Sequence, residues 1–443
     1  MRRFGPDAGE LMSSSGLALE QVSLTAAEAP RRRRSFFLHQ VEQVLVVLAL
    51  MLQAGAVLPA VRAYATGDPL RSDPVQQLVW AGLYLALLPF VLLRGHRVLS
   101  LMRHNGALTV LVLIAVLSIA WSIDPDLTLR RTGAVLVTTL FGVYLAARFG
   151  ARRSIGLLAV ATGAVVWLSL VAVVVVPELS IGSAYHPTAW KGVFLHKNML
   201  GRACLLAFIA LLFVAPRTKI ASWMRWVSFV PVVLCLAFSQ SATSIIVAAS
   251  ALLLTAIAHA FRGRAPLLVS LLLLSVVAVG ALGVGVLLHA DAALAMIERD
   301  ATLTGRTNLW SAILDALAQR PWAGHGYSAF WGESPEGAAT IAPIAGWEPP
   351  HAHNGFLQMG VDLGLVGLVM FALLIAAALR RALLLVRRTR TAAGIWPFVL
   401  ISAFLLQNLT DAVVMHNSAL WAAFVMAAAH LYDKARLLDD FDF

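Results

Sequence analysis

The sequence predicts an all-α, polytopic membrane protein with about twelve transmembrane helices and a large loop between the ninth and the tenth. Of the 443 residues, 60% are hydrophobic and only 13% are charged, and the mean hydropathy is +0.80. A soluble domain of this length would carry far more charge. Apolar runs follow one another along the chain, and a long polar and aromatic segment interrupts them late in the sequence.

The predicted helices are apolar runs of roughly 17 to 25 residues, the length that crosses a bilayer. They divide the chain into a polar tail at 1–40, helices 1 to 9 in 41–289, the large loop at 290–354, helices 10 to 12 in 355–432 and a tail at 433–443. The helices are expected to start near Val41, Val75, Ala107, Thr132, Ser154, Met199, Trp226, Ser244, Leu267, Gly355, Ala393 and Ser418.

The N-terminal tail contains the basic run Arg31–Arg34 and has no apolar core followed by a cleavage site, so we expect a retained cytoplasmic tail. The net charge of +11 comes from basic residues that separate the apolar runs, which argues against a nucleic-acid partner. Cys204 and Cys235 both lie in apolar runs and indicate packing, with no disulfide or zinc pattern.

The basic residues also predict the orientation of the chain. With both termini in the cytoplasm, 24 of the 34 Lys and Arg residues fall on the cytoplasmic side. The large loop and the loop near 178–198 then lie on the outer, periplasmic side of the membrane. We expect these two outer loops to carry the function.

An amphipathic helix is predicted within the large loop. Trp310, Ile313, Leu314 and Leu317 recur at helical spacing. Thr304 or Thr307 is a candidate cap and Pro321 a terminator. The following PWAGHGYSAFW is rich in glycine and aromatic residues, a composition that suits stacking on sugar rings and equally suits anchoring at the membrane interface.

His353 and Asn354 lie where a membrane helix begins, a costly place for polar groups without a use. A histidine there can accept a proton near neutral pH, although it can also simply hydrogen-bond a loop carbonyl. A metal site of His351, His353 and His325 is a weaker alternative, because no carboxylate or cysteine stands at metal-site spacing from them.

Two further groups of candidates carry positive charge. Arg306 at the start of the amphipathic helix offers a guanidinium that suits a diphosphate, or caps the helix. The stretch GVFLHKNMLGR places Lys197 and Asn198 at the outer start of a span and Arg202 about one turn inside it. Snorkelling to the interface is the alternative for Lys197.

Hydroxyl groups form the last set. Ser241 and Thr243 belong to SQSATS, a short outer turn that either lines a polar groove or bonds its own backbone.

Asp362 and Asp411 are the carboxylates nearest the membrane on this side, and each needs a partner that the sequence does not name. The chain has no Walker A loop, no outer D-x-D and no G-x-S-x-G elbow.

Together these motifs resemble the O-antigen ligase and exopolysaccharide polymerase superfamily. His353, Asn354, Gly364 and Gly367 match its pattern H-N, nine residues, G, two residues, G, after GRTNLW and PWAGHG. The resemblance implies a GT-C-like, metal-independent, inverting glycosyltransferase of the bacterial inner membrane with a periplasmic active site. Its donor would be a glycan on undecaprenyl diphosphate, its acceptor a glycan or lipid A-core, and it would need no cofactor.

By that resemblance His353 activates or orients the acceptor hydroxyl and Arg306 holds the diphosphate. Lys197, Asn198, Arg202, Asn354, His325, Ser241 and Thr243 are then expected to bind substrate. The superfamily's ligases often carry an arginine after the serine of the SQSATS-like motif, where this chain has Ala242 and Thr243. Together with the HKN sequence, this departure makes the chain resemble exopolysaccharide polymerases more than ligases. The second contact to the phosphate is then made by Lys197 or Arg202, or by no residue.

Two other classes fit the residues. A transporter or lipid flippase would use the same polar helix ends as a substrate path, but transporters tend to have paired broken helices in two related halves. Here the polar residues gather on one side of the membrane. A structural or assembly protein is the third class, and the effect of alanine at His353 and Arg306 discriminates it. At a structural histidine alanine should lower the protein level, whereas at a catalytic one it should leave the level intact and remove product.

Overall fold

The computed structural model describes residues 37–61, 74–182, 186–260, 265–288, 304–347, 349–389 and 391–433, with side chains for all of these except 265, 266, 269, 282–288 and 304–307. Its elements are helices, and the β-structure of the described residues is the isolated bridge between Ile181 and Trp190. The predicted tail at 1–40 and the start of the large loop at 290–303 fall largely or wholly outside this description. The all-α prediction is confirmed.

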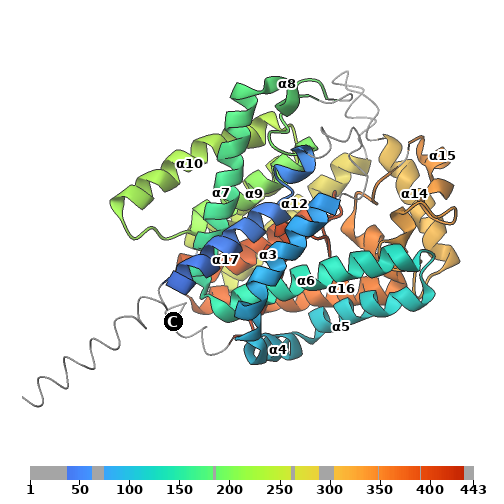
Figure 1. Cartoon of the computed structure of the whole chain (residues 1–443), viewed down its shortest axis with the longest axis horizontal. Helices are drawn as coiled ribbons and strands as arrows, with labels where there is room; N and C mark the ends of the chain where they lie inside the picture. The colour runs from blue at the N-terminus through green and yellow to red at the C-terminus, as the bar shows by residue number, and fades with distance from the viewer. Residues whose placement is uncertain are drawn as a thin grey trace, which may run out of the picture.

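The helices are arranged as a bundle of long rods with short helices at its ends (Figure 1). They are Phe37–Gln53, α3 (Pro74–Leu92), α4 (Gly95–His104), α5 (Gly106–Leu117), η1 (Ser118–Trp121), α6 (Pro125–Arg148), α7 (Ala151–Val175), α8 (Pro177–Ser180), α9 (Lys197–Phe213), α10 (Lys219–Phe238), α11 (Ala242–Ala260), α12 (Ala265–Leu288), α14 (Thr304–Gln319), η2 (Ala329–Trp331), η3 (Ala338–Thr340), α15 (Ala342–Ala345), α16 (Gly355–Arg388), α17 (Ala392–Asn408) and α18 (Ala419–His430).

Several of these helices can cross a membrane, as the composition predicts. Five described helices are long and apolar enough, and a sixth span results if α4 and α5, bent by 97°, count as one. Each of the twelve predicted starts coincides with a helix, but several of these helices are short or carry charges. The chain is a multi-pass membrane protein, and the number twelve stays a prediction.

The centre of the bundle is built by the C-terminal helices. Every residue of α18 is buried, and α17 is buried along its whole length. The indole N–H of Trp421 in α18 donates to Thr139 of α6, and Thr138 of α6 donates to Asn417 just before α18. These bonds fix α6 against the start of α18. By contrast α3 lies at the edge of the bundle, with Leu87 as its one buried residue.

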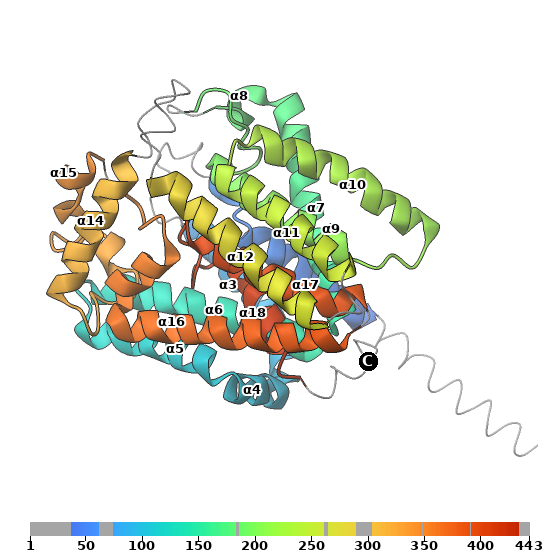
Figure 2. The same cartoon turned by 180° about the vertical axis from the view of Figure 1, so that it is seen from behind.

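The large loop folds as a small cap at the N-terminal end of α16, where α14 and α15 lie together (right in Figure 1, left in Figure 2). It has its own apolar core, which includes Leu309, Ile313, Phe330 and Ile341 and reaches Val361 of α16. A helix, α14, lies where the amphipathic helix was predicted. Its buried face is rotated from the predicted one, because Leu314 is 53% exposed.

A break in α16 connects this cap to the membrane helices. Gly364 has φ 67° and ψ −166°, so the helical bonding stops there. The freed amide of Leu365 donates to the carbonyl of Pro321 at 2.7 Å, and His325 N–H donates to Val361 O at 3.0 Å. The PWAGHG segment therefore docks into the break. This contact explains why the two motifs occur in one sequence.

Candidate functional site

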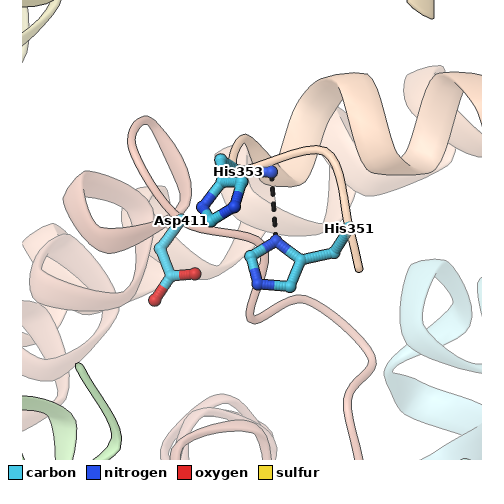
Figure 3. Close-up of side chains that lie close together, drawn as sticks. All are labelled: His351, His353 and Asp411. Atoms are coloured by element: carbon cyan, nitrogen blue, oxygen red, sulfur yellow. Dashed lines mark hydrogen bonds between the residues drawn. The ribbon is translucent and has the colours of Figure 1, made fainter. Parts of the chain in front are cut away.

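Three side chains predicted or noted from the sequence converge at the N-terminal end of α16. His351 and His353 come from the loop before α16, and Asp411 from the loop between α17 and α18 (Figure 3). Their potential ligand atoms all lie within 4.8 Å of one another. We call these three residues the His–Asp cluster.

The backbone of the cluster is held in a tight turn. His353 has φ 51°, in the left-handed region, and its N–H donates to Nδ1 of His351 at 3.1 Å. The two imidazole rings lie 4.1 Å apart between centroids. Strained backbone of this kind persists only where surrounding contacts hold it, and such sites are often functional.

Those surrounding contacts come from the cap and from α16. The indole N–H of Trp310 in α14 donates to the carbonyl of Ala352 at 3.0 Å, and the amide of Ala352 donates to the side chain of Gln358 at 3.0 Å. Trp310 and Gln358 therefore hold Ala352, the residue between the two histidines, in place. The cap helix thus orients the His–Asp cluster directly.

Asn354 caps α16. Its side-chain oxygen accepts from the backbone N–H groups of Phe356 and Leu357 at 2.9 and 3.1 Å, and its amide donates to Leu409 O at 3.1 Å. N-caps satisfy helix-end amides in this way. The side chain thereby joins the start of α16 to the loop that carries Asp411. The sequence analysis expected Asn354 to bind substrate. In the structure, Asn354 helps to position the His–Asp cluster.

Asp411 has the partner that the sequence left unnamed. Arg202 of α9 donates to Oδ2 of Asp411 at 2.9 Å, Gln407 donates to the same oxygen at 3.3 Å, and the N–H of Ala412 donates to Oδ1 at 2.9 Å. Burial alone would raise the pKa of Asp411, but Arg202 and the two histidines outweigh it and hold that pKa well below its usual range. Asp411 is thus an anion that neutralises Arg202 in part.

Two histidines near this ion pair, His351 and His416, have lowered pKa values and are neutral near neutral pH. Burial lowers the pKa of His351 well below its usual value, and the neighbouring His353 lowers it further. Burial, followed by Arg202, lowers the pKa of His416 to about 4. A neutral imidazole can accept a proton from a hydroxyl, which a charged one cannot.

A cavity of about 350 Å³ adjoins the cluster. Its polar lining includes Arg202 and His416, and also Arg131 of α6. Arg131 and His416 were not selected from the sequence, because neither lies in a motif that the sequence analysis identified. Arg202, which binds Asp411, therefore connects this cavity to the His–Asp cluster.

The turns near the N-terminus of α9 also meet near this site. Lys197 donates to the carbonyl of Gln240 at 3.2 Å, and Thr243 shares a hydrogen bond of 2.7 Å with Thr410, the neighbour of Asp411. Ser241 is buried and donates to Ser244. The structure therefore brings HKN, SQSATS and the Asp411 loop together. Asn198 lies in the first turn of α9, where its N–H donates to His196.

The remaining two candidates lie outside the cluster. His325 is buried, packs edge-on against Phe330 and hydrogen-bonds Val361 O through Nδ1 at 3.1 Å. Arg306 lies in the first turn of α14, and its side chain is outside the described residues.

A metal ion would find a different donor set here from the one the sequence suggested. Among the described residues, Asp411 takes the place of His325 beside His351 and His353. Two imidazoles and a carboxylate suit zinc or a similar ion. However, Arg202 occupies the carboxylate oxygen Oδ2, and a guanidinium at that position opposes a second cation. The donor atoms are therefore of the kinds that bind such an ion, but the positive charge of Arg202 beside them opposes its binding.

Comparison with known proteins supports the resemblance seen in the motifs. The O-antigen ligase family matches residues 227–372, a range that contains Arg306, His325 and His353. The chain is 27% identical to the exopolysaccharide production protein ExoQ of Rhizobium meliloti (strain 1021) over 325 residues, which are 70% of this chain and 71% of that relative. The chain is thus similar to O-antigen ligases over residues 227–372 and to an exopolysaccharide production protein over most of its length.

Proposed function

We propose that this protein is a glycosyltransferase that moves an oligosaccharide from undecaprenyl diphosphate to a glycan acceptor on the periplasmic face of the inner membrane. The observation that carries the proposal is the His–Asp cluster beside a cavity that Arg202 and Arg131 line. The arrangement offers a proton acceptor and cations at one end of a membrane bundle. A glycosyl-diphosphate donor requires both.

The reaction proceeds by direct displacement. The acceptor hydroxyl oxygen forms a bond to the anomeric carbon while the bond from that carbon to the diphosphate oxygen breaks. The electron pair leaves with the undecaprenyl diphosphate, and His353 takes the hydroxyl proton. Attack opposite the leaving group inverts the anomeric centre. The donor bond supplies the energy, so no nucleotide is needed.

Each residue of the site has a defined role in this scheme. His353 orients and deprotonates the acceptor, while His351 and Asn354 hold its turn. Arg202, with Arg306 at the start of α14, offsets the charge that develops on the diphosphate. The reaction is metal-independent in our proposal, because Arg202 already serves the carboxylate that an ion would need.

Chain growth is the favoured outcome of the transfer. The matched relative is an exopolysaccharide production protein, and the family match is to O-antigen ligases, so the acceptor is either another lipid-linked glycan or a lipid A-core. We propose a polymerase, since HKN and the missing arginine in SQSATS also point that way.

The test is an in vitro reaction of the purified protein in detergent with the undecaprenyl-diphosphate oligosaccharide of its host and EDTA present. His353→Ala should reduce product by roughly 100-fold or more, the range for general acid–base groups. His259→Ala is the matched control, because His259 lies at the far end of α11 and hydrogen-bonds only its own helix.

The outcomes separate the classes. Longer chains from the donor alone indicate a polymerase, and product only with added lipid A-core indicates a ligase. Loss of product with EDTA contradicts the metal-independent scheme. Movement of the donor across vesicle membranes without bond formation indicates a transporter. If His353→Ala has the same protein level as the wild type and full activity, His353 is not a catalytic residue.

A further inference from the structure

A second cavity, of about 330 Å³, lies in the C-terminal half of α16, at the opposite end of that helix from the His–Asp cluster. We propose that this cavity binds an anionic phospholipid. Arg380 and Arg387 hold its phosphate, and one of its acyl chains lies in the groove between α12 and α16. The proposal does not depend on the transfer reaction.

The lining of the cavity comes from one face of α16 and from α12, which packs against it (Figure 2). The residues of α16 recur at spacings of three and four, the spacing of side chains that share a helix face. α12 adds Leu273 to them. The lining residues of α16 are Ala376, Leu379, Arg380, Leu383, Leu384 and Arg387.

Charge is the first step of the argument. Arg380 and Arg387 are exposed, and among the described residues no acidic side chain forms an ion pair with either of them or lines the cavity. The neighbouring Arg381 instead lies over the ring of Tyr432, 3.8 Å from its centroid. A guanidinium binds phosphate oxygens through two parallel hydrogen bonds, so the two lining arginines favour a phosphate.

The apolar part of the lining determines which phosphate compound fits. Apart from the two arginines, every residue of the lining is apolar. Leu273 is 42% exposed, so the groove opens on the outside of the bundle, along helices that the membrane surrounds. A phospholipid uses both the charged and the apolar parts of the groove, whereas a free phosphate would leave the apolar part uncovered.

The position of the arginines along α16 agrees with a lipid headgroup. They are seven residues apart, which is about 10 Å along the helix axis, and Arg387 lies in the last turn. The predicted orientation puts this end of α16 at the cytoplasmic surface, where anionic lipids give the membrane a negative potential. Basic pockets between membrane helices bind the headgroups of such lipids.

The experiment measures lipid binding to the full-length protein in neutral detergent by native mass spectrometry. The probes are phosphatidylglycerol and phosphatidylethanolamine with the same acyl chains, and inorganic phosphate serves as a competitor. The charge variants are Arg380→Gln, Arg387→Gln and the two combined. Arg388→Gln is the matched control, because Arg388 is the adjacent exposed arginine of α16 and does not line the cavity.

A second pair of variants tests the groove without changing a charge. Ala376→Leu places a larger side chain in the cavity lining and should fill part of the space for the acyl chain. Ala372→Leu is its control, because Ala372 is an exposed alanine one turn earlier on α16 that does not line the cavity. Ala376→Leu should lower the binding of phosphatidylglycerol, and Ala372→Leu should leave it unchanged.

Phosphatidylglycerol should bind more tightly than phosphatidylethanolamine, and inorganic phosphate should compete only weakly. Each single arginine variant should weaken phosphatidylglycerol binding by about fivefold, which corresponds to about 1 kcal/mol for a basic residue near an anionic lipid. The combined variant should weaken it by roughly 25-fold, if the two contacts add. Arg388→Gln should bind as the wild type does.

Four results would overturn the inference. Equal binding of the two lipids would mean that the groove does not recognise charge, and equal weakening in Arg388→Gln would mean a diffuse attraction. Displacement of the lipid by inorganic phosphate at similar concentration would mean a site for a free anion. A dimer in the wild-type spectrum that is lost in Arg387→Gln would mean that a second copy of the chain occupies the groove.

Discussion

At the scale of single residues, the site depends on one ion pair between distant parts of the chain. Arg202 and Asp411 are 2.9 Å apart, and their side chains are 25% and 7% exposed. The pair is connected to the histidines on one side and to the cavity on the other. It therefore links the His–Asp cluster to the cavity.

We predict that breaking this pair on one side destabilises the protein strongly. Arg202→Met leaves the buried Asp411 without its cation and should lower the free energy of unfolding by about 3 kcal/mol, the lower end of the range for one-sided removal of a buried pair. Thermal unfolding in detergent measures this effect.

The double variant Arg202→Met with Asp411→Leu is the control, because it removes both charges together. It should recover part of the loss, since apolar replacement of a whole buried pair is often neutral. A double variant no more stable than Arg202→Met would contradict a coupling between the two residues.

Sequence reasoning found the parts of the site at this scale but not their pairing. Arg202 and Asp411 were each selected because a charge at membrane depth needs a use. Nothing in the spacing joined them, because they lie 209 residues apart and meet only through the packing of α9 and α17. For the same reason the sequence discounted a carboxylate beside His351 and His353, and it missed Arg131.

At the scale of elements, the break in α16 links the outer cap to the membrane bundle. A Cβ on Gly364 would lie 2.3 Å from the carbonyl of Trp322, and the residue has a positive φ. Gly324 faces it from the docked segment, also with a positive φ. Both glycines belong to the motifs on which the resemblance to the superfamily rests. In the structure, these motifs form the contact between the PWAGHG segment and the break in α16.

We predict that Gly364→Ala undocks the PWAGHG segment. The methyl group both strains the left-handed backbone and clashes with Trp322, which should cost roughly 2 kcal/mol or more of stability. The variant should also lose transfer activity, because α14 holds the residue between the two histidines through Trp310. Unfolding curves and the in vitro assay measure the two effects.

Gly156→Ala in α7 provides the comparison, since a Cβ there meets nothing within 4 Å. It should be neutral or slightly stabilising in a helix. Equal effects of the two substitutions would mean that the break in α16 has no special importance.

The elements themselves were well predicted from the sequence. Apolar runs of helical length and the periodicity of Trp310, Ile313 and Leu317 were sufficient to locate the helices and α14. The rotated face of α14 was not predicted, because the cap packs on α16 and on its own loops instead of on the membrane surface alone. Which face of α14 is buried depends on tertiary contacts, and the spacing of apolar residues along the helix does not reveal these contacts.

At the scale of the whole molecule, the candidate site lies where the cap meets the membrane helices. The cap helices α14 and α15 lie together at one end of the bundle, away from α4 (Figure 1), and Trp310 of α14 bonds to Ala352 between the two histidines of the His–Asp cluster. This arrangement agrees with a one-sided enzyme. It also places several histidines in a common protected region outside the spans.

These histidines make stability depend on pH. Burial lowers the pKa of His416 to about 4, and it also lowers the pKa values of His325 and His196. Each is therefore neutral in the folded state at a pH where the unfolded chain, with a pKa of about 6.5, already binds a proton. Between those values the unfolded state binds more protons, so stability falls as the pH falls.

We predict that the unfolding temperature in detergent stays constant from pH 8 to about pH 7 and then decreases steadily as the pH falls through 6.5 towards 4. Each histidine adds at most about 1.4 kcal/mol per pH unit within its own window. His416→Gln should flatten part of this decrease, because glutamine does not titrate. An unfolding temperature that does not change between pH 7 and pH 4, or a His416→Gln curve that runs parallel to that of the wild type, would show that these histidines are protonated without cost in the folded protein.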